Sequence, residues 1–286
     1  MKRGNEIYFA GLDIGSTMTK AVILDEGEEI VNYVLGPTGP EHRRLANMVM
    51  EEVLNKPGLL IDNVAYIVAT GYGRINVPFA DAQVTEITCH ARGIIKLFPE
   101  VSTIIDIGGQ DCKGIRVKDG KVANFVMNDK CAAGTGRFLE IIAETLGIKV
   151  SEMGDLSLNA KEKVRISNIC TVFAVQEIMA YSAKGIPHEN IVAGLHEGLA
   201  TRICNMARRI GITKEVVITG GGGKNKGLVR EIDDHLEIET LQSFEPLISG
   251  ALGASLLAKE MAHKQLEKGK SLPLKERSLK EVRLFG

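Results

Sequence analysis

The sequence predicts an α/β protein made of two duplicated domains. The first observation is an internal repeat: Asp13-Ile14-Gly15-Ser16 recurs at one fixed offset as Asp106-Ile107-Gly108-Gly109, and Lys20-Ala21-Val22 recurs as Lys113-Gly114-Ile115. The second is that each copy alternates short apolar runs with turns rich in glycine and charged residues, which is typical of antiparallel strands. A repeat that keeps its register indicates the duplication of a whole structural unit.

The composition is that of a globular protein with a substantial core. The 286 residues are 44% hydrophobic and 25% charged, and 35 Lys and Arg balance 36 Asp and Glu, for a formal charge of −1. This balance excludes disorder as the main state and argues against nucleic acid or an anionic membrane as the principal ligand. No apolar run suits a signal peptide or a membrane span, so we expect a cytoplasmic protein. Five cysteines, an odd number, favour reduced thiols or metal ligands over disulfides.

Each copy predicts the same order of strand, polar turn, strand, charged turn and strand. The first strands are expected at residues 7–12 and 103–105, and the charged turns at 25–28 and 118–121. A further apolar strand at 65–70 leads into Gly71-Tyr72-Gly73-Arg74, which we interpret as a strand-ending turn. Helices are expected at 136–146, 172–184 and 226–235.

The polar turns after the two first strands have the chemistry of phosphate-binding loops. Glycine lets backbone amides converge on an anion where a side chain would block the approach. A carboxylate beside a bound phosphate needs a divalent cation between them, so Asp13 and Asp106 are candidates to hold hydrated Mg2+. One such copy alone is also typical of an ordinary strand-end turn. The candidate phosphate-binding residues are Gly15, Ser16, Thr17, Lys20, Gly108 and Gly109.

A third glycine cluster follows another apolar strand, at 216–219. Four successive glycines, 220–223, are entropically costly to order, which indicates a need for close backbone approach, and a purine with its ribose would meet that need. A flexible hinge loop accounts for this segment equally well. The candidate nucleoside-binding residues are Gly220, Gly221, Gly222 and Asn225.

Two common nucleotide-binding motifs are absent from the sequence. It contains no Gly-x-x-x-x-Gly-Lys-Ser/Thr and no Gly-x-Gly-x-x-Gly after the first strand. A P-loop NTPase is therefore unsupported, and a Rossmann dinucleotide-binding domain is disfavoured.

The three loops, in this order on a duplicated plan, resemble the superfamily of acetate and sugar kinases, heat-shock chaperone ATPases and actin. Within it, residues 128–138, NDKCAAGTGRF, together with 106–111, 170–174 and 71–74, resemble the activators of 2-hydroxyacyl-CoA dehydratases. These belong to a wider ATPase family that includes subunits of benzoyl-CoA reductase. The resemblance implies two duplicated actin-like (ribonuclease H-like) ATPase domains, a nucleotide cleft between them, and ATP or ADP with Mg2+ as ligands.

The resemblance also implies an iron–sulfur centre. In that family a homodimer holds one 4Fe-4S cluster across its twofold axis, and by motif match Cys131 and Cys170 are the two ligands of each chain. Independently, each of these cysteines precedes a predicted helix, whose N-terminal amides favour a thiolate. Two thiolates are half of what a cubane cluster needs, and a twofold dimer would complete it. Spacing alone is also compatible with buried, small hydrophobic cysteines, as we expect for Cys89, Cys112 and Cys204.

The implied function is ATP-driven transfer of a low-potential electron to a partner iron–sulfur enzyme, a 2-hydroxyacyl-CoA dehydratase or a related reductase. Ferredoxin or flavodoxin is the implied donor, and an anaerobic setting is expected. Gln110 or Asp111 would orient the attacking water, by analogy with other NTPases. Two alternatives stay open: a small-molecule kinase of the same superfamily, and a nucleotide-switched regulatory module.

The repeat sets the expected domain limits. We expect a first domain over residues 1–100, a second over 101–248 that carries the cluster cysteines, a helix over 249–262 that packs back on the first domain, and a basic extension over 263–286. Small residues from 250 to 258 favour a closely packed helix. Lys and Arg outnumber Asp and Glu from Lys264 onward, which favours a solvated C-terminal extension.

Overall fold

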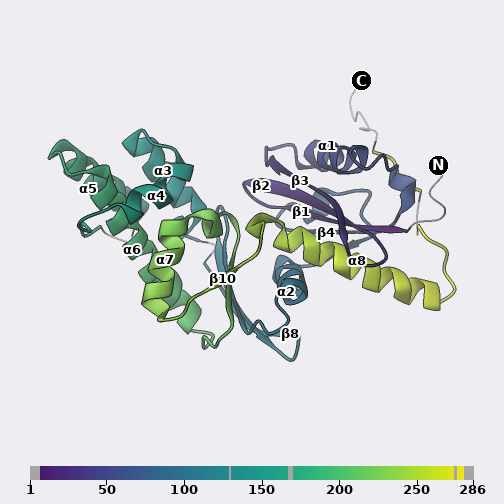
Figure 1. Cartoon of the computed structure of the whole chain (residues 1–286). Helices are drawn as coiled ribbons and strands as arrows, with labels where there is room; N and C mark the ends of the chain where they lie inside the picture. Colours follow the sequence, from purple (N-terminus) through teal and green to yellow (C-terminus); the bar gives the residue numbers. More distant parts are fainter. Residues whose placement is uncertain (1–6, 129, 167–169, 274–275, 280–286) are drawn as a thin grey trace, which may run out of the picture. The chain divides into compact units, whose positions relative to one another are not determined.

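The structure, a computed structural model, describes residues 7–128, 130–166, 170–273 and 276–279. The chain forms two compact units, one made of Met1–Pro99 with Leu247–Gly286 and the other of Glu100–Pro246. Each unit holds a five-stranded sheet with helices packed on it (Figure 1). In the described part of the chain, no helix is both long and apolar enough to cross a membrane.

The sheet of the first unit has the order β3-β2-β1-β4-β5. Strands β1, β2 and β3 form an antiparallel meander, while β4 and β5 continue the sheet in parallel with β1. All seven residues of β1 are buried, as expected for a central strand covered on both faces. The strands are β1 (Tyr8–Ile14), β2 (Met18–Leu24), β3 (Ile30–Pro37), β4 (Val64–Thr70) and β5 (Ala82–Gln83).

Two helical layers cover the faces of this sheet. Alternate residues of β1, Tyr8 and Leu12 among them, pack with helix α1 (His42–Asn55) in one core cluster. Phe9, on the opposite face, packs with residues of α2 (Glu86–Leu97) and α8 (Ser249–Glu267). Because side chains alternate along a strand, Asp13 shares the α2 and α8 face with Phe9.

Helices α2 and α8 approach each other and β1 through glycines. A Cβ at Gly253 would overlap the carbonyl oxygen of Cys89, and a Cβ at Gly93 would overlap that of Ser249. Gly11 of β1 is equally tight against the backbone of α8 at Ala251. The small residues noted in the sequence therefore pack α8 closely on the sheet and on α2 of the first unit.

The sheet of the second unit has the order β8-β7-β6-β9-β10, which corresponds strand by strand to the order β3-β2-β1-β4-β5 of the first. Its first three strands again form an antiparallel meander, and β9 and β10 are again added in parallel. This identity of topology confirms the duplication that the sequence predicts. The strands are β6 (Thr103–Ile107), β7 (Cys112–Lys118), β8 (Lys121–Asn128), β9 (Val216–Thr219) and β10 (Leu241–Gln242).

Five helices build the second unit's large core with Ile105 and Ile107 of β6 (Figure 1). Asp106, on the other face of β6, points away from this core. The helices are α3 (Gly136–Leu146), α4 (Met153–Leu158), α5 (Thr171–Ala183), α6 (His188–Arg208) and α7 (Lys226–Leu236).

The predicted boundaries differ from the structure mainly at strand and helix ends. The first strand of each copy runs two residues further than expected, so Asp13 and Asp106 lie within β1 and β6. The reason is the antiparallel pairing of each aspartate with a lysine, Lys20 or Lys113, on the next strand. Helix α8 also continues to Glu267, beyond residue 262.

The C-terminal extension is not uniformly solvated. Arg277 is buried, and its guanidinium donates to the carbonyl oxygens of Val64 and Ala65 and to the carboxylate of Asp81. Leu279 packs against the core of the first unit. The expectation of a solvated tail is therefore wrong for residues 276–279, because this arginine satisfies carbonyl groups at the start of β4; residues 274–275 and 280–286 lie outside the described residues.

Candidate functional site

The first candidate phosphate loop connects β1 to β2. Asp13 is buried, and Lys20, its partner across the strand pair, donates from Nζ to Asp13 Oδ2 at 2.9 Å. Gly15, Ser16 and Thr17 form the turn between them and are partly exposed. A Cβ at Gly15 would lie 2.8 Å from the carbonyl oxygen of Met18, so this turn requires glycine.

The second unit repeats the pair with an additional carboxylate. Lys113 Nζ donates to Asp106 Oδ2 at 3.3 Å and to Asp111 Oδ1 at 2.6 Å. Lys113 and Asp106 are both buried, while Asp111 is partly exposed and Gln110 is exposed. Two carboxylates facing one ammonium leave a net negative charge, which suits a hydrated divalent cation better than the neutral Asp13–Lys20 pair does.

A glycine turn lies against each aspartate. Asp13 pairs with Thr70 of β4 and Asp106 with Thr219 of β9, and both threonines are followed by a glycine with positive φ. Gly71 has φ +83° and Gly220 has φ +81°. A Cβ at Gly71 would overlap Asp13 Oδ1, and one at Gly220 would lie 2.7 Å from Asp106 Oδ1.

Gly71-Tyr72-Gly73-Arg74 is thus the counterpart of the 220–223 cluster in the first unit. The strand-ending turn predicted for it is confirmed, and the structure adds that it borders Asp13. The spacing between aspartate and glycine differs in the two copies, so the fixed-offset repeat does not reveal this equivalence. The shared Thr-Gly at the end of each parallel strand is the signal that could have revealed it.

The phosphate loop of the second unit is bonded to the start of helix α3. Gly136 N donates to the carbonyl oxygen of Gly108 at 2.8 Å, and Arg137 N donates to that of Gly109 at 2.7 Å. These amides are among those that a helix N-terminus leaves without an intrahelical partner. The loop is therefore held directly to the start of α3, which follows Cys131 in the sequence.

The 220–223 cluster forms a short 3-10 turn, Gly221–Lys224, before α7. Gly220 N donates to the carbonyl oxygen of Pro246 at 3.1 Å, and Asn225 N donates to that of Gly222 at 3.1 Å. The side chain of Asn225 is directed inward: it caps α7 by accepting from Leu228 N and donates to His196. The amide oxygen and the amide nitrogen of Asn225 are thus both hydrogen-bonded within the unit. A nucleoside would therefore contact the backbone of this turn and not the Asn225 side chain.

The five cysteines fall into two groups. Burial raises the pKa of Cys89 to about 12 and that of Cys204 to about 11, and it raises the pKa of Cys112 as well. Cys131 and Cys170 are instead partly exposed. Since the thiolate is the metal-binding form, burial disfavours the other three cysteines as ligands, and the partial exposure of Cys131 and Cys170 favours these two. All five are free thiols.

Of the two partly exposed cysteines, Cys170 lies directly at the start of a helix, whereas Cys131 lies several residues before one. Cys170 is the N-cap of α5, whose first turn has no acidic residue, and the helix dipole there favours an anion. Cys131 precedes α3, and its carbonyl oxygen accepts from Asn128 Nδ2 at 3.1 Å. Within the described chain no three His, Cys, Asp or Glu side chains form a metal-binding group. Two cysteines per chain fit a cluster only if a second chain supplies the others.

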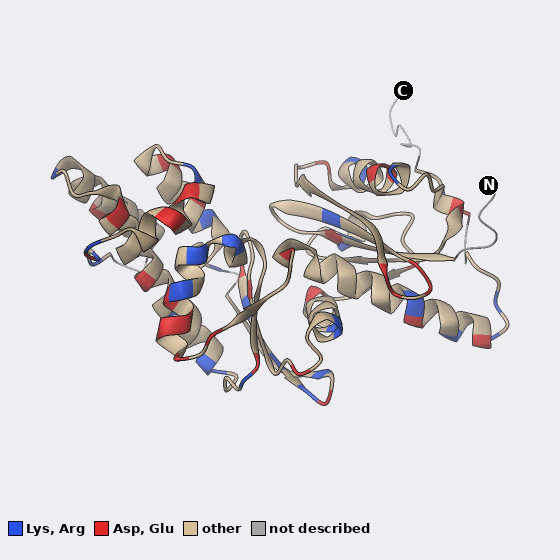
Figure 2. Ribbon diagram, in the orientation of Figure 1, with Lys and Arg blue, Asp and Glu red and all other residues tan. Residues whose placement is uncertain are grey.

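Helix α5 presents an apolar surface beside Cys170. Val172 is 61% exposed, Phe173 58% and Met179 59%. Glu177 is the sole charged residue between Thr171 and Ala183, and Figure 2 shows this helix as nearly free of charge. Large exposed apolar side chains in one place indicate a surface for another protein.

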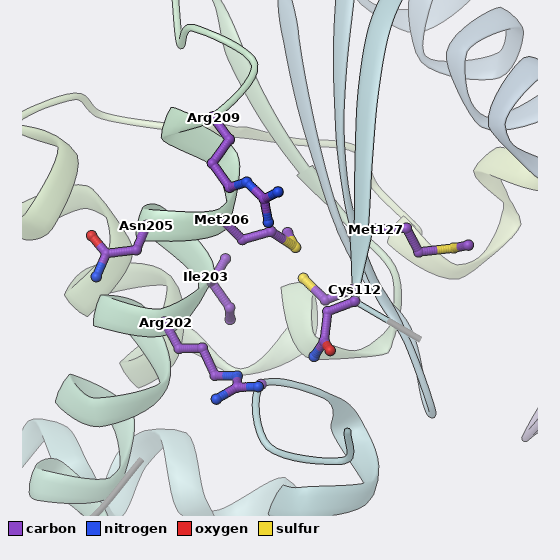
Figure 3. Close-up of a pocket in the computed structure, with 9 residues that line it drawn as sticks. Cys112, Met127, Arg202, Ile203, Asn205, Met206 and Arg209 are labelled. Carbon is purple, nitrogen blue, oxygen red and sulfur yellow. The ribbon is translucent and has the colours of Figure 1, made fainter. Parts of the chain in front are cut away.

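A pocket of about 310 Å³ lies between helix α6 and strands β7 and β8. Arg202 and Arg209 line it from the helix, and Cys112 and Met127 from the strands (Figure 3). Gly134, from the segment after Cys131, also borders it. Its lining does not include Gly108, Gly109 or Gly220, so this pocket is distinct from the candidate nucleotide loops.

Lys113 is a site residue that the sequence motifs alone did not predict. The structure places it between two of the predicted site residues, Asp106 and Asp111. The repeat contained the signal, because Lys113 recurs at the position of Lys20. A lysine is rarely fully buried, so its presence within an expected strand does not by itself indicate a site.

Two sheets of identical order, each with an Asp–Lys pair beside a glycine turn, define a duplicated actin-like ATPase fold. The model of the BadF/BadG/BcrA/BcrD ATPase family matches residues 10–258, and the chain belongs to this family. The resemblance that the sequence motifs indicate is thereby confirmed.

Relatives in the family match over almost their whole length. The 2-hydroxyisocaproyl-CoA dehydratase activator of Clostridioides difficile is 42% identical over 272 residues, which are 93% of this chain and 100% of the relative. The (R)-2-hydroxyglutaryl-CoA dehydratase activating ATPase of Acidaminococcus fermentans is 43% identical over 259 residues, 90% of this chain and 99% of the relative. A solved structure of the 2-hydroxyisocaproyl-CoA dehydratase activator from Clostridium difficile with bound ADPNP has a TM-score of 0.87 at 42% identity, and covers 93% of this chain and 99% of that one.

Proposed function

We propose that this protein uses ATP to drive low-potential electrons into a partner dehydratase of the 2-hydroxyacyl-CoA type or a related reductase. The observation that carries the proposal is the pair of hydrogen bonds from the start of α3 to Gly108 and Gly109. These bonds connect the candidate phosphate loop to the segment that contains Cys131. The similarity to activators of 2-hydroxyisocaproyl-CoA and (R)-2-hydroxyglutaryl-CoA dehydratases supports the same class of acceptor.

In this proposal the glycine-containing loops bind the nucleotide. Amides and hydroxyls of the first loop, with Lys20, and amides of Gly108 and Gly109 bind phosphate oxygens. The backbone of Gly220, Gly221 and Gly222 faces the nucleoside. Gln110, which is exposed, or Asp111 orients the attacking water.

Asp13 and Asp106 hold hydrated Mg2+, which neutralises phosphate charge when it is bound. The carboxylates of Asp106 and Asp111 fit this task because Lys113 balances one of their two charges. Asp13 is balanced by Lys20, so a phosphate that attracts Lys20 would release Asp13 for the cation.

Cys131 and Cys170 bind one 4Fe-4S cluster together with the same residues of a second copy. A cluster held by these residues would supply a single low-potential electron to the acceptor, and ferredoxin or flavodoxin would be its donor. The apolar surface of α5 supports a homodimer, because an isologous interface buries the same patch, here Val172, Phe173 and Met179, on both subunits. Burying these side chains would offset the cost of ordering the interface.

The link from phosphate loop to cysteine explains how hydrolysis could be coupled to transfer. A ligand shifts a conformational equilibrium only by binding one state better than the other. ATP and ADP differ at the phosphate oxygens, which are the atoms nearest Gly108 and Gly109 in this proposal. A shift of these two carbonyls pulls directly on the amides of Gly136 and Arg137.

A small-molecule kinase of the same superfamily is the alternative function. It would need neither of the exposed cysteines and no apolar surface on α5. The division of the cysteines into three buried and two exposed thiols favours the electron-transfer function.

The test is ATP-dependent reduction of a purified 2-hydroxyacyl-CoA dehydratase under anaerobic conditions. The change in the absorbance spectrum of the dehydratase measures its reduction. We expect reduction with the wild-type protein and none with Cys131→Ser or Cys170→Ser. Cys89→Ser, which changes a buried thiol, is the matched control and should keep the activity. Equal reduction by wild type and both serine variants would contradict the proposal, as would ATP turnover that requires a sugar or acid substrate.

A further inference from the structure

A series of hydrogen-bonded polar side chains, two buried and one partly exposed, joins three helices behind the 220–223 turn. His196 of α6 is fully buried, its Nε2 lies 3.0 Å from Asn225 Nδ2, and its Nδ1 lies 2.8 Å from Ser157 Oγ of α4. Asn225 Oδ1 accepts from Leu228 N at 3.0 Å, and Ser157 Oγ donates to the carbonyl oxygen of Gly154 at 3.0 Å. Helices α4, α6 and α7 therefore meet at a single histidine (Figure 1).

The donor and acceptor of each hydrogen bond in this series of side chains follow from the backbone groups at its two ends. Leu228 N can only donate, so the Asn225 atom that faces it is oxygen, and the amide nitrogen faces His196. His196 Nε2 must then accept, which places the ring proton on Nδ1, where it is donated to Ser157. Ser157 in turn donates to a carbonyl oxygen, which can only accept. One neutral tautomer of His196 satisfies all the groups.

Two glycines make room for this junction. A Cβ at Gly227, in the first turn of α7, would overlap Ser157 Oγ and would lie 2.9 Å from His196 Nδ1. A Cβ at Gly154 would lie 3.1 Å from Asn225 Oδ1. The backbones of α4 and α7 thus approach each other closely beside the hydrogen-bonded side chains.

The same asparagine ends the glycine turn. Asn225 N closes the turn by donating to Gly222 O, and its side chain caps α7. Rotating the Asn225 amide would set its NH2 group against Leu228 N–H, and protonating His196 would set a second donor against Asn225. The position of the turn's last residue is therefore fixed by the histidine, although His196 itself does not belong to the turn.

We propose that His196 is a positioning residue for nucleotide binding, which holds the backbone of the 220–224 turn in its binding conformation through Asn225. The proposal rests on the proposed role of this turn in binding the nucleoside. It assigns Asn225 an indirect role, in which its effect on the nucleotide passes through the cap of α7.

His235 offers a matched control in the same pair of helices. Its Nε2 lies 2.9 Å from Thr201 Oγ1, so it also connects α7 to α6, but from the last turn of α7. Its Nδ1 lies 2.9 Å from the carbonyl oxygen of Glu231. If histidine only stabilised the α6–α7 contact, substitutions of His196 and His235 would affect nucleotide binding equally. If His196 has a positioning role, only its substitution weakens nucleotide binding.

The experiment measures the Kd of a fluorescent ADP analogue with Mg2+ for the wild type, His196→Gln and His235→Gln. We expect His196→Gln to weaken binding about tenfold, the equivalent of one lost hydrogen bond. We expect His235→Gln to stay within about twofold of the wild type. In ATP hydrolysis, His196→Gln should raise KM with little change in kcat, because a positioning effect on the nucleoside is uniform binding.

A second variant covers the case in which His196→Gln does not fold. Ser157→Ala leaves both His196 and Asn225 in place but removes the acceptor of the Nδ1 proton, and we expect it to weaken binding about threefold. Unchanged Kd values in His196→Gln or Ser157→Ala would overturn the proposal, and so would an equal loss in His235→Gln. Failure of the wild type to bind the analogue would instead contradict the nucleotide site itself.

Discussion

At the scale of single residues, the site is built from charges and polar groups whose partners are remote in sequence. The repeated Asp-Ile-Gly predicts the two equivalent turns of the candidate phosphate loops, because ordinary strand-end turns do not repeat it in register. The inward direction of Asn225 could not be predicted, because it depends on His196 and Ser157, which no local pattern connects to it. For the same reason the sequence could not show that Gly71 borders Asp13.

The buried histidine makes stability depend on pH in a definite direction. Burial lowers the pKa of His196 from its ordinary value of 6.5 to about 3. Between these values the unfolded chain binds a proton at this residue that the folded chain does not, so stability is lost as the pH falls from 6.5 toward 3. The contribution is at most about 1.4 kcal/mol per pH unit.

Urea unfolding at several pH values between about 6.5 and 4 measures this contribution. We expect the free energy of unfolding to fall less steeply with decreasing pH in His196→Gln than in the wild type. His188→Gln, at the start of the same helix, should retain the wild-type slope. Equal slopes in the wild type and His196→Gln would mean that His196 is not held neutral in the folded protein.

At the scale of elements, periodicity and turn chemistry predict most of the fold. Helix α3 begins and ends at the predicted residues, α7 ends one residue later than predicted, and α5 begins and ends one residue earlier. Strand ends were less predictable, because the antiparallel pairing of Asp13 with Lys20 extends β1 beyond its apolar run. Whether a polar residue at the end of an apolar run belongs to the strand depends on its pairing partner on the next strand.

The α2–α8 contact gives a direct test of the glycine packing. Gly253→Ala places a methyl group against the Cys89 carbonyl, a backbone atom that cannot move aside, so we expect a loss of about 3 kcal/mol or more of stability. Gly39→Ala is the matched control, because its Cβ meets nothing within 4 Å, and it should be nearly neutral. Chemical denaturation checks both, and a loss below about 1 kcal/mol in Gly253→Ala would show that the helices are further apart than described.

The anchored part of the C-terminal extension predicts a stabilising role for one arginine. Arg277→Met removes a buried guanidinium from the carboxylate of Asp81, and the first unit should lose about 3 kcal/mol of stability. The double variant Arg277→Met, Asp81→Asn should recover part of this loss, because the uncompensated carboxylate is removed as well. Thermal unfolding compares the three proteins, and an unchanged melting temperature in Arg277→Met would show that residues 276–279 do not bind the first unit in solution.

At the scale of the whole molecule, the fold and the chemistry are separable. Duplication explains the two sheets and their loops, and it applies to every member of the fold class. Cys131, Cys170 and the apolar surface of α5 belong to the second unit and have no counterpart in the repeated Asp–Lys and glycine-turn pattern. The hydrogen bonds from α3 to Gly108 and Gly109 join this addition to the nucleotide loops.

The stoichiometry of iron tests the central claim most directly. The protein is reconstituted anaerobically with iron and sulfide, and native mass spectrometry then measures the mass of the assembly and its inorganic content. We expect a dimer of two chains that contains four iron and four sulfide ions, and the loss of these ions in Cys131→Ser and in Cys170→Ser. A cluster bound by a single chain, or a dimer of the serine variants that keeps its iron, would contradict the account.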